Sequence, residues 1–208
     1  MSKLRLAVLL SGSGSNLQAL FDAYDDGVLD AEIALVLSDR ADAYGLQRAL
    51  VHNTPVAFIP LAAVAQPQRA AVRMAWEQRL AQVIAAFSPH VILLSGFMRV
   101  LSAEFLAHFP NRVINQHPAL LPDDGADTVL LSSGQRIPAL RGAHVVADAL
   151  QLGLTVTGCT VHRVTPRVDD GPILARAEVP IRADDDETTL HERIKAAERR
   201  LIRRCGTA

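Results

Sequence analysis

The sequence has few of the cysteines and metal-ligand motifs that are typical of disulfide-stabilised or metal-binding proteins. It carries two cysteines, Cys159 and Cys205, which lie far apart and form no ligand pair. We interpret them as incidental thiols of a protein from a reducing cytosol. The histidines and acids also lack the spacing of a metal-binding motif. We therefore predict no metal site.

Long apolar runs and an excess of one charge are also missing. No apolar run approaches the roughly 20 residues that a helix needs to cross a bilayer. The formal net charge is −1, with acids and bases interspersed, which argues against nucleic acid or an anionic membrane as a partner. The N-terminal segment is basic and then apolar, but it lacks the small-residue cleavage pattern of a signal peptide. We interpret it as a first strand. We expect a cytoplasmic protein that holds any anionic ligand locally.

What the chain does have is a regular alternation of apolar runs and helical patterns. At 208 residues, half of them hydrophobic, it is long enough for one well-buried domain. Strand-length apolar runs alternate with amphipathic stretches, which predicts a doubly wound α/β fold with a mostly parallel sheet and helices on both faces. The expected strands are residues 4–10, 33–37, 56–59 and 91–94, then 155–164 and 173–179; the expected helices include residues 68–87, 143–152 and 190–204.

A glycine-rich turn follows the first strand. Residues 11–16 read Ser-Gly-Ser-Gly-Ser-Asn, and a helical pattern begins at Leu17. Such a turn leaves backbone N–H groups at a helix N-terminus, where the helix dipole also favours an anion. The turn lacks the third glycine of a dinucleotide fingerprint and the Gly-Lys-Ser/Thr ending of a P-loop. It favours a monophosphate over NAD or ATP, with a plain tight turn as the alternative.

The segment with the most chemistry is residues 115–122, Asn-Gln-His-Pro-Ala-Leu-Leu-Pro, after a short apolar run. In an extended chain Asn115 and His117 point to the same side. An imidazole that titrates near neutrality and a carboxamide that donates to an oxyanion are the groups that acyl transfer needs. The plainer alternative is a hydrogen-bonded histidine beside a turn asparagine.

Two adjacent acids, Asp169 and Asp170, precede Gly171 and Pro172 in a second turn. Turn chemistry alone explains them. The functional alternative places one carboxylate against His117, where it raises the pKa of the ring and fixes its tautomer.

With these motifs in this order, the chain resembles the phosphoribosylglycinamide formyltransferase family, the folate-dependent enzymes of purine biosynthesis, over nearly its whole length. Each motif is weak alone, and their order at strand ends is what makes the match strong. They are residues 11–17, residues 96–99 (Gly-Phe-Met-Arg), residues 115–122, residues 160–162 (Thr-Val-His) and residues 169–172.

The resemblance implies a role for individual residues. Asn115, His117 and Asp169 match the catalytic trio, in which the asparagine steadies the formyl oxyanion, the histidine donates a proton and the aspartate elevates the histidine pKa. The implied sites for the ribonucleotide and the folate take in further positions. The ribonucleotide site comprises Gly14, Ser15, Asn16, Lys195 and Glu198, and the folate site comprises Arg73, Met98, Arg99, Val100, Leu101, Asn115 and His144.

The implied reaction moves a formyl group from 10-formyltetrahydrofolate to the amine of 5-phosphoribosylglycinamide. The amine attacks directly, so the co-substrates are small molecules and no covalent enzyme intermediate is required. The oligomeric state stays open, a homodimer included.

The chain departs from the family pattern at residues 123–140, a stretch that we interpret as a surface insertion in a single domain of residues 1–208. Arg141 follows, where the family usually has proline, which puts folate contacts near His144 in question. Two outcomes are open: a bulge that leaves the ligand crevice at the carboxyl ends of the strands intact, or a loop that partly covers this crevice.

Three rival functions remain. A formyltetrahydrofolate hydrolase or the catalytic half of a methionyl-tRNA formyltransferase could use the same Asn, His and Asp. The glycine-serine turn argues against both. We also find no second, basic domain to bind tRNA and no extra N-terminal regulatory domain. A silent phosphoribosyl-binding protein, with folate entry blocked by the insertion, is the third.

Overall fold

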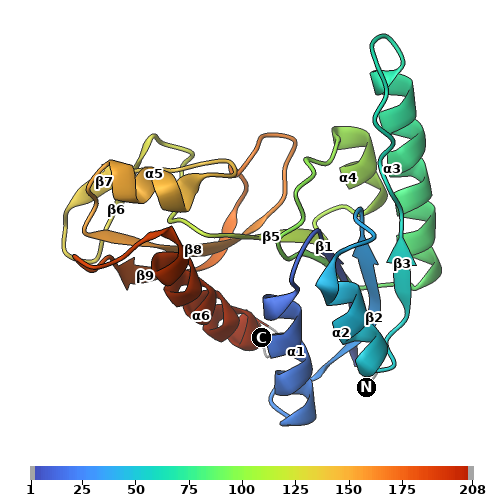
Figure 1. The fold of residues 1–208 in the computed structure, drawn as a ribbon, viewed down its shortest axis with the longest axis horizontal. Coiled ribbons are helices and arrows are strands. Elements are labelled where there is room, and N and C mark those ends of the chain that lie inside the picture. Colours follow the sequence, from blue (N-terminus) through green and yellow to red (C-terminus); the bar gives the residue numbers. More distant parts are fainter. Residues whose placement is uncertain (1–2, 206–208) are drawn as a thin grey trace. The chain divides into compact units, whose positions relative to one another are not determined.

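The computed structural model describes residues 3–205, with side chains described as far as residue 202. The described residues form two compact units, and the division lies between Val113 and Ile114. Figure 1 labels their helices and strands. The single domain of residues 1–208 stays a prediction. The Cys205 thiol lies outside the described side chains.

The first unit is built on parallel strands in the order β3-β2-β1-β4. These are β1 (Leu4–Leu10), β2 (Ala31–Ser38), β3 (Val56–Phe58) and β4 (Val91–Leu94). The long central strands are almost continuously apolar because helices cover both of their faces. Leu9 pairs with Leu37 of β2 and with Leu94 of β4, so the carboxyl ends of these three strands lie side by side. Ligands of open α/β sheets bind at this edge.

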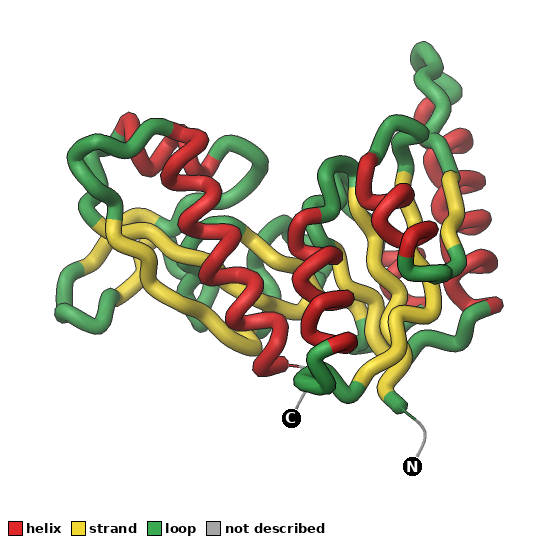
Figure 2. The backbone as a smooth tube through the Cα atoms, turned by 60° about the horizontal axis from the view of Figure 1, so that its bottom comes forward, coloured by secondary structure: helices red, strands yellow, loops and turns green. Residues whose placement is uncertain are grey.

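The helices of the first unit are α1 (Ser15–Asp25), α2 (Tyr44–Val51), α3 (Arg69–Ala86) and α4 (Ala103–His108). From β1 to β3 the chain moves in one direction across the sheet, and from β3 to β4 it returns past β1. Right-handed crossovers therefore place α1 and α2 on one face and α3 on the other, as Figures 1 and 2 show. The unit ends as the chain enters β5 (Val113–His117), where the N–H of Ile92 donates to the carbonyl of Arg112 at 2.8 Å.

The second unit is organised on antiparallel strands. β5 pairs with β8 (Val156–Arg163), and β8 pairs with β9 (Ile173–Pro180). Helices α5 (Val145–Gln151) and α6 (Glu187–Cys205) cover one face, and Figure 2 shows α6 lying along the strands. The core on this face joins both helices to β8 and β9; it includes Val145, Val146, Cys159, Val161, Val179, Leu190, Ile194 and Ala197.

The predicted insertion forms a hairpin of β6 (Thr128–Leu130) and β7 (Arg136–Pro138). Its buried Val129, Leu131 and Ile137 pack with Leu120, and Val156 of β8 packs against this cluster. Since side chains alternate along a strand, Val156 points away from Cys159 and Val161. The hairpin therefore covers the face of β8 opposite to α5 and α6. Within residues 3–205, no helix is both long and apolar enough to cross a membrane.

Candidate active site

Strand pairing in the second unit brings the predicted catalytic segment against β8. Asn115 lies opposite His162, and His117 lies opposite Thr160. Pro118 ends the strand directly after His117. The Thr160 hydroxyl then ties down the following loop, donating to the Ala119 carbonyl at 2.8 Å and accepting from the Leu121 N–H at 3.1 Å. The loop after the strand is thus held by hydrogen bonds on β8.

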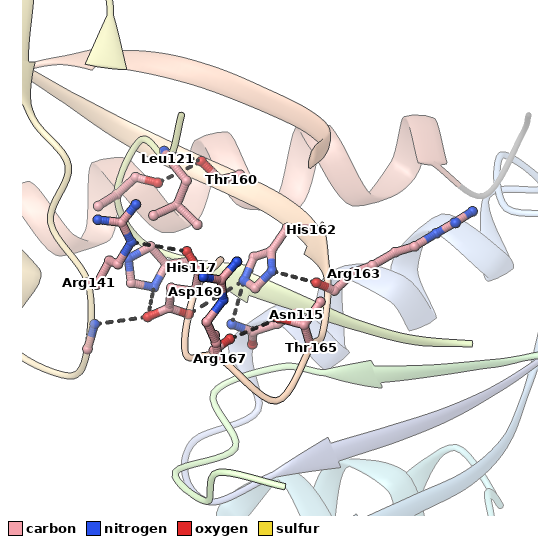
Figure 3. Close-up of polar contacts among 12 residues, drawn as sticks. Asn115, His117, Leu121, Arg141, Thr160, His162, Arg163, Thr165, Arg167 and Asp169 are labelled. Atoms are coloured by element: carbon pink, nitrogen blue, oxygen red, sulfur yellow. Dashed lines mark hydrogen bonds and ion pairs between the residues drawn. The ribbon is translucent and has the colours of Figure 1, made fainter. Parts of the chain in front are cut away.

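The structure brings Asn115, His117 and Asp169 together around His162 (Figure 3). Nδ1 of His117 lies 3.5 Å from Oδ2 of Asp169, and Nε2 of His162 lies 3.5 Å from Oδ1 of the same carboxylate. Nδ2 of Asn115 lies 3.2 Å from Nε2 of His162. One carboxylate, two imidazoles and one carboxamide therefore form a continuous polar cluster.

The turn between β8 and β9 aims the Asp169 carboxylate into this cluster. Asp169 has φ +51°, a left-handed conformation that non-glycine residues adopt with strain. The N–H of Arg163 donates to the carbonyl of Pro172 at 2.9 Å and closes the turn. The N–H of Gly142 donates to Oδ2 of Asp169, also at 2.9 Å. The Asp169 side chain is 8% exposed, so its charge is held in a largely dry site.

His117 is almost fully buried, and its tautomer follows from its partner. Nε2 lies 2.8 Å from the carbonyl oxygen of Leu140, which can only accept, so Nε2 carries a proton. In the neutral ring Nδ1 then presents its lone pair toward Asp169. Burial lowers the pKa of His117 below its ordinary 6.5, although the Asp169 charge and the Leu140 carbonyl act to raise it. At neutral pH the ring is a neutral proton acceptor whose charged form the carboxylate would stabilise.

Asp169 is held in its charged form. Burial alone would raise its pKa, but His162, His117 and the N–H of Gly142 together outweigh burial and keep the pKa below the ordinary 3.8. The effect of Asp169 on His117 has the predicted sign, since the carboxylate raises the histidine pKa. The net shift of His117 is nevertheless downward because burial is the larger effect.

His162 is the member of the cluster to which sequence reasoning gave no role. Its Nδ1 lies 2.9 Å from the carbonyl of Arg163, which places a proton on Nδ1, and its Nε2 faces both Asn115 and Asp169. The side chain is 2% exposed. The motif at residues 160–162 was visible in the sequence. The pairing register that sets His162 opposite Asn115 was not.

The predicted phosphate turn lies in the first unit and opens α1. Gly14 is the N-cap residue with φ +67°, and no acidic side chain occupies the first turn of the helix. A Cβ atom on Gly14 would lie 2.6 Å from Cα of Gly45 in α2. The turn is held from outside by Arg48, whose Nε donates to the carbonyl of Ser13 at 2.9 Å. The geometry suits an anion at the start of α1.

The predicted folate residues of the first unit follow β4 or lie on α3. The guanidinium of Arg73 donates to the Val100 carbonyl and lies 3.4 Å from the buried carboxylate of Glu77. Met98 and Val100 are 68% and 52% exposed, while Leu101 is buried. An apolar side chain held on the surface by such a scaffold is typical of a binding site for a flat ligand.

Asp39, the residue directly after β2, forms hydrogen bonds with the loop after β1 and with the loop after β4. Its buried carboxylate accepts from the Ser11 hydroxyl at 2.6 Å and from Nε of Arg99 at 2.6 Å. The same Ser11 oxygen accepts from the N–H of Met98 at 2.9 Å. The predicted phosphate turn and the predicted folate loop therefore share one buried carboxylate, which was not singled out in the sequence.

The remaining predicted residues lie on helices of the second unit. Lys195 and Glu198 lie one turn apart on α6, with Lys195 paired to Glu192 at 2.7 Å and Glu198 buried. His144 occupies the N-cap position of α5 and is exposed. Among residues 3–205, no group of three or more His, Cys, Asp or Glu side chains is arranged to hold a metal ion.

The chain is similar to proteins of one family over nearly its whole length. The formyl transferase family model matches residues 4–205. The phosphoribosylglycinamide formyltransferase of Mycobacterium tuberculosis (strain ATCC 25618 / H37Rv) is 42% identical over 198 residues, which are 95% of this chain and 81% of that protein. The Escherichia coli (strain K12) enzyme of the same name is 35% identical over 195 residues, 94% of this chain and 82% of that protein.

Solved structures are similar over the same length. Glycinamide ribonucleotide transformylase 1 from Symbiobacterium toebii has a TM-score of 0.81 and 37% identity, covering 97% of this chain and 85% of that one. The phosphoribosylglycinamide formyltransferase of Coxiella burnetii has a TM-score of 0.82 and 35% identity, covering 99% and 86%. The predicted α/β fold with a mostly parallel sheet is confirmed. The chain belongs to the formyl transferase family and, within it, to the phosphoribosylglycinamide formyltransferases.

Proposed function

We propose that this chain transfers a formyl group from 10-formyltetrahydrofolate to the amine of 5-phosphoribosylglycinamide, a step of purine biosynthesis. The proposal includes a cytoplasmic location and small-molecule substrates only. The observation that carries it is the polar cluster of Asn115, His117 and Asp169, in which an imidazole can exchange a proton, a carboxylate can stabilise the charged imidazole and a carboxamide can donate to an oxygen.

The cluster suits acyl transfer to an amine. When the amine attacks the formyl carbon, the formyl oxygen gains negative charge and the nitrogen must lose a proton. Nδ2 of Asn115 carries two protons; His162 accepts one of them at 3.2 Å, which leaves the second for the oxygen. His117 accepts a proton at Nδ1, and Asp169 at 3.5 Å stabilises the charged ring until the proton returns to the leaving nitrogen.

The first unit supplies the features expected of the two ligand sites. The turn at Gly14 presents the start of α1 to the phosphate of the ribonucleotide, with Ser15 and Asn16 as its first helical residues. The exposed Met98 and Val100, next to Arg73, suit the flat ring and acidic tail of a folate. We include Lys195, Glu198 and His144 as binding residues on the basis of their matching positions in the family.

A steady-state assay tests the function directly. Purified protein is mixed with 10-formyltetrahydrofolate, with and without the ribonucleotide, and deformylated folate is followed. Turnover that requires the ribonucleotide supports the proposal. Turnover without it would instead indicate a hydrolase, and ribonucleotide binding without turnover would indicate a silent binding protein.

A further inference from the structure

Residues 140–142, at the end of the predicted insertion and just beyond it, contact the side chains of His117 and Asp169 through their backbone. The Leu140 carbonyl accepts from Nε2 of His117 at 2.8 Å, and the N–H of Gly142 donates to Oδ2 of Asp169 at 2.9 Å. One bond selects the tautomer of the histidine, and the other orients the carboxylate. The placement of residues 140–142 therefore decides how His117 and Asp169 face each other.

Arg141, between these two residues, fixes the segment with its side chain. Nη2 donates to the carbonyls of Ala126 at 2.9 Å and Gly125 at 3.2 Å. Nε lies 3.4 Å from the carbonyl of Asp169, a contact that Figure 3 shows. A planar guanidinium that spans three carbonyls restrains the backbone far more than a single contact does. The side chain thus joins the start of the insertion to the backbone of the catalytic aspartate.

The start of the insertion is itself packed tightly enough to serve as an anchor. Gly125 has φ +70°, and a Cβ atom on it would lie 2.6 Å from Oδ1 of Asp170. Further along, Ser132 donates to the carboxylate of Glu178 on β9 through its N–H at 2.6 Å and its hydroxyl at 2.8 Å. The insertion is therefore fixed both to the turn that carries Asp169 and to the sheet.

We propose that Arg141 is a positioning residue: by tying residues 125 and 126 of the insertion to the backbone of Asp169, it holds the segment whose carbonyl and amide set the geometry of His117 and Asp169. The insertion then acts as a brace for the active site. As a statement about catalysis this rests on the proposed function. As a statement about the tautomer of His117 it stands alone.

The test uses Arg141→Ala and Arg141→Lys, with Arg136→Ala as the matched control. Arg136 belongs to the same insertion, but its guanidinium bonds the hydroxyl of Thr128 at 3.2 Å, and the side chain is not part of the catalytic cluster. Histidine ¹⁵N NMR reports the tautomer of His117. Steady-state kinetics report kcat and the KM for each substrate.

We expect Nε2-protonated His117 in the wild type and the Arg136 variant, and a mixture of tautomers in Arg141→Ala. We also expect kcat of Arg141→Ala to fall about 10- to 100-fold with both KM values nearly unchanged, because small displacements of reacting groups are this costly. Arg141→Lys should be intermediate, since it keeps the charge but not the planar fork.

Two results would overturn the proposal. An unchanged His117 tautomer in Arg141→Ala shows that the segment holds its place without the guanidinium. A raised KM with unchanged kcat shows that Arg141 binds substrate directly.

If Arg141→Ala does not fold, Gly125→Ala tests the same brace, because its Cβ would push the insertion away from Asp170. A wild-type tautomer in that variant also contradicts the proposal. If the wild-type protein shows no formyl transfer, the proposed function fails, and the NMR measurement of the His117 tautomer still tests whether Arg141 positions the segment.

Discussion

Nδ1 of His117 lies 3.5 Å from Oδ2 of Asp169, with the ring on β5 and the carboxylate on the turn after β8. Both side chains are at least nine-tenths buried. The ring bonds the Leu140 carbonyl through its other nitrogen, and the carboxylate accepts from the N–H of Gly142. The backbone of Leu140 and Gly142 therefore contacts both members of this buried pair, a titratable ring and a charged carboxylate.

The buried histidine predicts how stability depends on pH. The folded-state pKa of His117 lies below 6.5, so between that pKa and 6.5 the unfolded chain binds more protons. The free energy of unfolding therefore falls as pH drops through this range, by up to about 1.4 kcal/mol per pH unit for one proton. The lowered pKa of Asp169 has the same effect below pH 3.8, where the free energy of unfolding also falls as pH drops.

Urea unfolding between pH 7 and pH 5 checks this expectation, with His117→Gln as the comparison. The pKa of His191 is also lowered, by burial and by Lys195, so some slope persists in the variant. We expect the variant to show a smaller slope than the wild type. Equal slopes would mean that His117 is protonated in the folded protein as readily as in the unfolded one.

His162 is expected to act through Asn115. His162→Gln keeps an acceptor near the position of Nε2, whereas His162→Asn does not. We expect the first variant to retain kcat within about tenfold and the second to lose about 10²-fold, the usual scale for an oxyanion donor. Because the effect passes through one carboxamide, Asn115→Ala combined with His162→Asn should be no slower than Asn115→Ala alone. A double variant with additive losses would assign His162 a separate role, toward Asp169.

Gly14 should tolerate no side chain. A methyl group there meets Cα of Gly45 at 2.6 Å and forces a left-handed φ on alanine. We expect Gly14→Ala to lower the free energy of unfolding by about 1–3 kcal/mol and to weaken ribonucleotide binding. Gly12→Ala is the control for stability, since nothing lies within 4 Å of its Cβ position. Equal thermal stability of the two variants would contradict the close approach of α1 and α2.

Asp39→Asn should loosen the folate loop. Arg99 would lose its buried ionic partner, and Ser11 would keep only a neutral acceptor. We expect the KM for 10-formyltetrahydrofolate to rise about tenfold, the scale of one charged hydrogen bond. Asp42→Asn, which removes an exposed ion pair with Arg40, should leave this KM unchanged. A wild-type KM in Asp39→Asn would show that Arg99 needs no fixed orientation.

Much of the fold could be predicted because strands that are buried on both faces of a parallel sheet have continuous apolar sequences. The expected first strand coincides with β1, and the helix expected over residues 68–87 appears as α3 (Arg69–Ala86). The short α4 and β7 were missed, since each has too few residues to show a period. The antiparallel direction of β8 and β9 was also missed, because alternation along one strand does not reveal the direction of its neighbour.

The site was predictable only where chemistry and order along the chain coincided. Asn115, His117 and Asp169 were predicted as catalytic residues because an imidazole and a carboxamide suit acyl transfer and because all three positions match the family's motifs. Their catalytic roles stay predictions. His162 and Asp39 depend on strand register and on loop contacts that residue types do not encode. The Leu140 carbonyl and the Gly142 amide are backbone groups, which sequence patterns do not distinguish from any others. The bulge considered for the insertion is instead a hairpin packed on the sheet.

The role of Asp169 beside His117 is tested most directly by single-turnover formyl transfer in Asp169→Asn, with the ribonucleotide dissociation constant measured on the same protein. The variant keeps the shape of the side chain and removes the charge that stabilises protonated His117. We predict a rate about 10²- to 10⁴-fold below that of the wild type, the range for loss of proton-transfer catalysis, with ribonucleotide affinity nearly unchanged. A large loss of affinity with an intact rate would show that Asp169 binds the ribonucleotide and does not act on His117.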